Sequence, residues 1–399
     1  MLPPSEYGIT ASQEERVLDQ LASSHTIRII VDVFDHDEKP IKTIQPDLLG
    51  GQVTVDATQD VSRSLSLELL DPFHKLQFDS TNPAEGALFA DNFIGVKYGV
   101  FVEDGLGWVD IPVFFGPMTS FKRDGDIVTV EAQGKETLGL DPHSAVYSYA
   151  LRKGMQVRLA IQDVMGRVGE TKFRLGMIRG KLPKARAVVP GEQPWRVCVG
   201  GDTDAAGGKK PSLMSKAAGN FYMFYDGRGY LTAKRKNATS VFTFRETRHV
   251  LTEPSYEYDV LSFRNHAEVR GGIPKKSKRH VRGEYTLPAG HPLSPTSLKR
   301  NGRGRFLTIF HEADGLKTEL ACRNKARQLV EATAFQGVSA QFEALPIPML
   351  EENDTITLDM GAYNLTFQLK SFTIPLTADA SMSVGYTKRA RLPKGRRSF

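Results

Sequence analysis

The stretch GQVTVDATQDVSRSLSLELLD, residues 51–71, contains two runs of alternating residues separated by a polar turn. In its second run a leucine occupies every other position from Leu65 to Leu69, and polar residues lie between the leucines. Side chains that alternate in this way point to opposite faces of a half-buried β-strand. Val53 and Val55 continue the pattern before the turn. The stretch therefore predicts two strands, with the leucines of the second one buried.

Further strand patterns lie on both sides of this stretch. The candidates are residues 27–33, 93–102, 109–115 and 127–132, and Asp124-Gly125 supplies a tight turn before the last of them. About six short strands in one segment are typical of a closed or nearly closed barrel, or of a sandwich. We therefore expect a first β-barrel-like domain over residues 26–140.

Residues 141–255 mix helical and strand patterns, which predicts a mixed α/β domain. The expected elements are helices over residues 157–168 and 211–218 and a hairpin of residues 221–225 with residues 230–234. Lys181 to Gly208 is rich in proline, glycine and charge, and this composition predicts an extended loop.

Strand periodicity returns in residues 256–387, which we expect to form a second β module. Its expected elements are a strand over residues 258–269, a basic loop over 271–305, a helix over 316–335, and strands over 338–342, 355–359, 363–372 and 380–386. Residues 1–25 form an N-terminal arm with a helix that Ser12 can cap, and residues 388–399 form a basic tail. The predicted fold is mainly β with an α+β insert, in which two β-barrel-like modules flank the mixed domain.

The net charge of +6 is unevenly distributed along the chain. Residues 264–305 carry eleven Lys or Arg against two Glu, and residues 388–399 carry six and no acid, which leaves −9 for the remainder. Local basic segments on an acidic body indicate loops and tails that contact a partner. The predicted contact residues are Lys275, Lys276, Lys278, Arg279, Arg282, Lys299, Arg300, Arg303, Arg389, Arg391, Lys394, Arg396 and Arg397. Either an acidic protein surface or nucleic acid would neutralise them.

Motifs for catalysis, cofactors and metals are incomplete in this sequence. The glycine-rich residues 201–210 lack the spacing and the Ser or Thr of a phosphate-binding loop. His311-Glu312 begins like a zinc-protease helix, but no second histidine follows at the required spacing. Cys198 and Cys322 lie too far apart in the sequence for a zinc pair. We therefore predict no catalytic, cofactor-binding or metal-binding residue, and no enzymatic activity.

The sequence also bears on where the chain is made. It contains no run of apolar residues long enough to span a membrane and no secretory signal at its start. We expect synthesis and folding in a cytoplasm.

Four segments resemble the central baseplate and tail-hub proteins of tailed bacteriophages. They are residues 51–71 with an arginine in the turn, Val113 to Gly116 followed by residues 127–140, Asn265 to Gly271, and the helix over 316–335 followed by residues 344–354. Asn353 stands where glycine is usual in that family. The resemblance covers residues 26–390 in the order of the elements.

The resemblance implies a structural protein of the virion tail tip or baseplate. Members of this family form homotrimers whose two barrel-like domains alternate in a pseudo-sixfold ring. Such a ring would join the tail tube to a spike or fibre and line the channel for DNA ejection. The implied partners are a tail tube or distal tail protein, a spike or fibre protein and the tape measure protein, with transient passage of DNA. No cofactor and no appended hydrolase domain are expected.

Two other functions remain open at this point. A tail-associated peptidoglycan hydrolase would need a convergent pair of carboxyl groups in a deep cleft. A nucleic-acid-binding protein would need a continuous positive groove with exposed aromatic side chains.

Overall fold

The computed structural model describes most of the 399 residues. The chain folds into two compact units. The first unit comprises residues 1–201, 210–254 and 341–385, and the second comprises residues 202–209, 255–340 and 386–399. The residues that the structure does not describe are 24, 45–46, 75, 77–88, 90–91, 104, 142–146, 204–208, 220, 236–238, 259–262, 275–276, 298–303, 334–337, 363 and 388–399.

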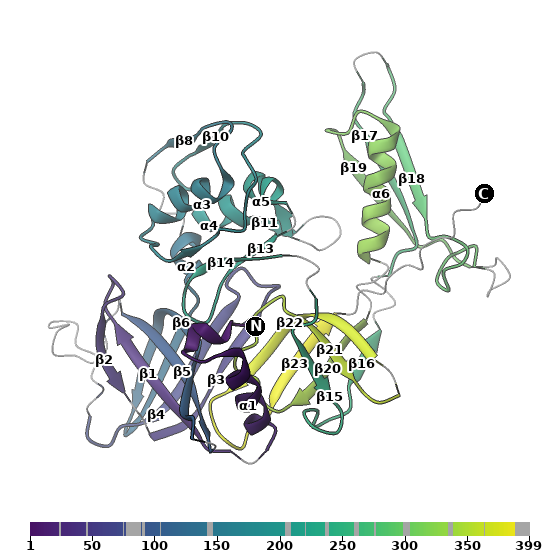
Figure 1. Ribbon diagram of the computed structural model, residues 1–399. Helices are drawn as coiled ribbons and strands as arrows, with labels where there is room; N and C mark the ends of the chain where they lie inside the picture. Colours follow the sequence, from purple (N-terminus) through teal and green to yellow (C-terminus); the bar gives the residue numbers. More distant parts are fainter. Residues whose placement is uncertain are drawn as a thin grey trace. The chain divides into compact units, whose positions relative to one another are not determined.

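A large sheet forms the body of the first unit (Figure 1). Its hydrogen-bonded strands follow the order β20 (Val338–Ala344), β23 (Met382–Thr387), β22 (Asn364–Pro375), β3 (Asp47–Asp56), β4 (Arg63–Leu70), β7 (Ile127–Gln133), β6 (Gly107–Asp124), β5 (Phe93–Val102), β1 (Ile27–Phe34) and β2 (Pro40–Ile44). β21 (Thr355–Asp359) pairs with β22, and β15 (Phe242–Arg245) pairs with β21. The prediction of a mainly β protein with a mixed insert is confirmed. Among the described residues, the strand pairings do not close into a ring.

Residues 51–71 contribute to the antiparallel strands β3 and β4 near the middle of this sheet. Leu65, Leu67 and Leu69 are buried, as predicted. β3 also pairs with β22, so that Val55 lies opposite Phe372. The two β segments that the sequence suggested as separate modules are therefore joined edge to edge through β3 and β22 (Figure 1).

β6 is the longest strand and connects two regions of the sheet. Its first part pairs with β5, and from Met118 onward it pairs with β7, with a register shift at that point. A bulge of this kind bends a strand and changes its direction. Gly116 lies just before the bend, where a Cβ atom would come within 1.9 Å of the Gln133 carbonyl oxygen. The close approach of the two strands explains the glycine at this position.

The N-terminal helix α1 (Ala11–Leu21) buries Val17 and Leu21. Its N-cap is Thr10, whose hydroxyl accepts from the amide of Gln13, while the Gln13 side chain accepts from the amide of Thr10. The expectation that Ser12 caps the helix is wrong by two residues, because Thr10 and Gln13 form a complete capping box.

The insert of the first unit combines short helices with short strands. The elements are α2 (Glu136–Leu140), β8 (Tyr149–Leu151), α3 (Val157–Gly166), β9 (Phe173–Arg174), β10 (Arg186–Val188), α4 (Pro194–Val199), β11 (Gly200–Thr203), β12 (Lys209–Pro211), α5 (Leu213–Ala218), β13 (Phe221–Tyr225) and β14 (Leu231–Arg235). The expected extended loop over residues 181–208 is wrong in part, since it contains β10 and α4. Pro194 occupies the first turn of α4, where a missing amide hydrogen costs nothing, and Trp195 is buried.

The second unit contains β16 (Ser255–Tyr258) and a three-stranded sheet of β18 (Arg282–Thr286), β17 (His266–Gly271) and β19 (Thr308–Ala313) with α6 (Glu319–Thr333) on one face (Figure 1). β18 corrects the expectation of a continuous loop over residues 271–305. A Cβ atom on Gly271 would lie 2.7 Å from Cys322 Sγ, and one on Gly283 would lie 2.3 Å from the Arg323 amide nitrogen. These glycines let α6 pack closely on the sheet.

The described residues include no helix that is both long enough and apolar enough to cross a membrane.

Candidate functional site

The most unusual feature of the first unit is a group of charged side chains that are almost completely buried. We call it the buried charged cluster, and it consists of Arg63, Lys135, Glu136, Glu170, Glu351, Glu352 and Asp354. Arg63 begins β4, Lys135 and Glu136 lie at the start of α2, Glu170 follows α3, and the last three lie in the turn before β21. Segments far apart in the sequence therefore meet at this cluster.

Arg63 connects its own strand, β4, to β6 and to the turn before β21. Its Nη1 donates to the carbonyl oxygen of Val113 at 2.6 Å, and its Nη2 donates to Glu351 Oε2. The other oxygen of Glu351 accepts from the amide of Gly227 at 3.0 Å. Burial raises the pKa of Glu351, while the Arg63 guanidinium acts in the opposite direction. Arg63 and Glu351 thus hold β4, β6 and the β13–β14 hairpin to the turn before β21.

Lys135 forms the second centre of the cluster. Its ammonium donates to Glu170 Oε1 at 2.9 Å and to Glu38 Oε1, and it faces the rings of Phe115 and Tyr225. The same Glu170 oxygen accepts from the amides of the two residues that follow it. Further hydrogen bonds offset the cost of burying an ion pair, and Oε1 of Glu170 has them, while Oε2 lies 2.7 Å from the Lys135 ammonium.

In the described part of the chain the carboxyl groups of the cluster are almost completely buried. Glu136, Glu351 and Glu352 are 1–4% exposed. Carboxyl groups that cleave a glycosidic bond must flank the bond in a cleft. The arrangement instead suits a structural junction that holds several segments of one unit together.

Glu352 gives this junction a pH dependence. Burial, aided by the neighbouring carboxylates of Glu136 and Glu351, raises its pKa from the ordinary value of 4.5 to about 7. The folded state therefore keeps a proton that the unfolded chain releases, and stability falls as the pH rises from 4.5 to 7. Glu352→Gln removes this loss. We expect the variant to gain about 2 kcal/mol relative to the native protein between pH 5 and pH 8. Urea unfolding at both pH values measures the gain, and a difference that does not change with pH contradicts the assignment.

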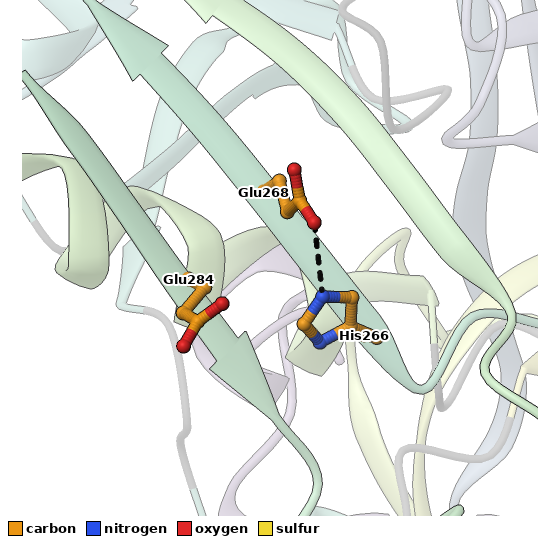
Figure 2. Close-up of side chains that lie close together, drawn as sticks. All are labelled: His266, Glu268 and Glu284. Carbon is orange, nitrogen blue, oxygen red and sulfur yellow. Dashed lines mark ion pairs between the residues drawn. The ribbon is translucent and has the colours of Figure 1, made fainter.

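A second group of polar side chains lies on the three-stranded sheet of the second unit. Among the described residues, His266, Glu268 and Glu284 place one ligand atom each within 4.8 Å of one another. Figure 2 shows His266 and Glu268 on β17, with Glu284 on β18 beside them. His266 Nε2 lies 3.6 Å from Glu268 Oε1, and its Nδ1 is within 2.8 Å of the Thr286 hydroxyl.

One imidazole and two carboxylates are a donor set that a divalent cation can use. In this case both carboxylates are exposed. Arg270 and Arg282 lie opposite each other two residues along the same two strands, and Arg270 forms an ion pair with Glu312. Sequence reasoning did not single out these three residues. Glu284 comes from the neighbouring strand, and its register opposite Glu268 is a property of the folded sheet.

Most of the predicted contact residues lie outside the described part of the chain. The described ones are Lys278, Arg279 and Arg282, and all three are exposed. The ones outside it are Lys275, Lys276, Lys299, Arg300, Arg303, Arg389, Arg391, Lys394, Arg396 and Arg397.

The fold of this chain is similar to that of proteins with known structures. No protein-family model matches the sequence, and no curated protein sequence matches it. The 43 kDa tail protein of prophage MuSo2 from Shewanella oneidensis is similar in structure, with a TM-score of 0.57 at 12% identity over 91% of this chain and 98% of that chain. The tail protein from Neisseria meningitidis MC58 is also similar, with a TM-score of 0.54 at 10% identity over 90% of this chain and 97% of that chain. The chain therefore shares its fold with these two tail proteins over nearly their whole length.

Proposed function

We propose that this chain is a structural protein of the tail tip or baseplate of a bacteriophage or a related injection machine. The observation that carries the proposal is the similarity of fold to two tail proteins over at least nine-tenths of this chain. The buried charged cluster supports a mechanical role, because its side chains are buried and join segments of the first unit.

In the finer form of the proposal, three chains form a ring. The two β segments, residues 26–140 and 256–387, act as the two ring-forming domains of each chain, and the mixed domain, residues 141–255, lies between them. The ring would join the tail tube to a spike or fibre and line the channel for DNA, as part of the virion. Its partners would be a tail tube or distal tail protein, a spike or fibre protein and the tape measure protein.

The exposed cations Lys278, Arg279 and Arg282, with the other basic residues of segments 275–303 and 388–397, would contact an acidic surface on one of these proteins. A protein partner is favoured over DNA, because tight phosphate binding along a channel would slow the passage of DNA.

The mass and symmetry of the assembled particle test the ring. We expect native mass spectrometry of the purified protein, with its tail partners added if needed, to give a mass of three chains, and electron microscopy of the particle to give threefold symmetry. A sixfold arrangement of whole chains, or a chain that stays monomeric in the particle, contradicts the proposal.

Zymography on cell-wall material separates this structural role from hydrolysis of the cell wall. Clearing that disappears when a single carboxylate is changed would assign the chain to the hydrolases.

A further inference from the structure

Positive charge is also concentrated in the insert of the first unit, outside the basic segments 264–305 and 388–399. Residues 152–186 contain ten Lys or Arg and only two acids. Four of the ten form ion pairs with acids, namely Arg167, Lys172, Arg174 and Arg186. The other six are exposed and have no acidic partner among the described ion pairs, and they are Arg152, Lys153, Arg158, Arg179, Lys181 and Lys184. We call these six the cationic patch.

Backbone pairing brings the two halves of the cationic patch together. The amide of Gly154 donates to the Leu182 carbonyl at 2.8 Å, and the amide of Val157 donates to the Gly180 carbonyl at 2.9 Å. Residues 152–158 therefore run beside residues 179–184. Six like charges held this close repel one another, and an anionic partner would remove that cost.

A hollow of about 360 Å³ lies within the patch. Its lining residues are Gln156, Arg158, Gly176, Ile178, Arg179 and Lys181, which include three cations and no acid. The Gln156 side-chain oxygen accepts from Arg158 Nε at 2.9 Å and so orients this guanidinium at the rim. The hollow has the charge and the donors to hold a phosphate group.

Two large exposed apolar side chains, Leu159 and Met177, are neighbours in the sequence of residues that line the hollow. Leu159 follows Arg158 in the first turn of α3 and is 44% exposed, and Met177 lies between Gly176 and Ile178 and is 56% exposed. The phosphate backbone of DNA offers no apolar region for such side chains, and no aromatic residue lines the hollow to stack on a base. Exposed apolar side chains among lysines and arginines are typical of surfaces that bind a bilayer, where the headgroups meet the acyl chains.

We propose that the cationic patch docks on an anionic lipid bilayer. The lysines and arginines bind the phosphate-bearing headgroups, and Leu159 and Met177 enter the interface below them. This contact goes beyond the structural role proposed above and does not depend on ring formation. It would hold this face of the insert against a membrane surface.

Flotation with vesicles tests the proposal on the full chain. We expect the native protein to bind vesicles of phosphatidylcholine with phosphatidylglycerol and not vesicles of phosphatidylcholine alone. Each cation near an anionic surface contributes about fivefold in affinity, so Arg158→Gln, Arg179→Gln and Lys181→Gln together should weaken binding roughly a hundredfold. Leu159→Ser with Met177→Ser should weaken it roughly tenfold.

A matched control carries the same loss of charge elsewhere in the first unit. Lys42, Lys122 and Arg235 are exposed and lie outside the patch, and changing all three to glutamine should alter vesicle binding by no more than about twofold. Equal losses in the two triple variants overturn the proposal. Retention of duplex DNA in a gel-shift assay, without binding to the anionic vesicles, also overturns it and assigns the patch to nucleic acid. All the substituted side chains are exposed, and unchanged thermal unfolding verifies that each variant is folded.

Discussion

Arg63→Met should lower the free energy of unfolding of the first unit by about 3–5 kcal/mol at neutral pH. Arg63 is 2% exposed, and its guanidinium is the counter-charge of Glu351 and a donor to the Val113 carbonyl. Methionine fills much of the same space but leaves the Glu351 carboxylate buried without the guanidinium that donates to it. A buried charge without a partner costs far more than an exposed pair ever contributes.

Urea unfolding followed by tryptophan fluorescence measures this loss, because both tryptophans, Trp108 and Trp195, lie in the first unit. Arg248→Met is the control, since both members of the Arg248–Asp19 pair are exposed and its loss should cost less than about 1 kcal/mol.

The charge on Glu351 gives a second test of the same idea. Adding Glu351→Gln to Arg63→Met should recover a large part of the stability, because the glutamine carries no charge. The loss in Arg63→Met should also shrink from pH 8 to pH 5, since the buried carboxyl takes up a proton as the pH falls. An Arg63→Met variant that loses no more than Arg248→Met would show that Arg63 and Glu351 are not a structural junction.

Leu67→Asp should cost on the order of 5 kcal/mol, which is enough to prevent accumulation of soluble protein. Leu67 is fully buried in β4, where it lies opposite Gly51 on β3 and Val130 on β7. The aspartate would carry a charge into the core between two neighbouring strands, with no cation beside it. Soluble yield and urea unfolding measure the effect.

Ser64→Asp is the matched control for this substitution. Ser64 lies on the same strand and is exposed, so the same new charge should change stability by less than about 0.5 kcal/mol. If both variants accumulate to the native level, the assignment of the leucines to the buried face is wrong.

Local patterns in the sequence were sufficient for most of the secondary structure. Strand alternation depends only on the pleat of the backbone, and it predicted β4, β5 and β7 closely. Helical spacing predicted α3 and α6, and the turn at Asp226 to Gly229 predicted the β13–β14 hairpin. β19 was not predicted, and its burial pattern shows no fully buried residue, so it lacks the apolar face on which the periodicity depends.

The glycines of the basic segment show where composition misled. Gly271 and Gly283 fall in the segment that was predicted to be a basic loop, but they lie on paired strands and leave room for α6. A glycine in a loop and a glycine under a helix look the same in the sequence. Only the approach of α6 distinguishes them.

The sequence by itself determined the mainly β architecture, because the two-residue alternation of a strand involves only residues that are neighbours in the sequence. Only the tertiary structure decided which charged side chains are buried, which are paired with an opposite charge and which are exposed. Arg63 and Glu351 are 288 positions apart in the sequence. Each is a charged residue of a type that usually lies in solvent. The same holds for the cationic patch, whose members form no ion pair with the described residues, whereas Lys172 and Arg174 do. Whether a charge is buried, paired or free depends on distances between remote segments, and the folded chain sets those distances.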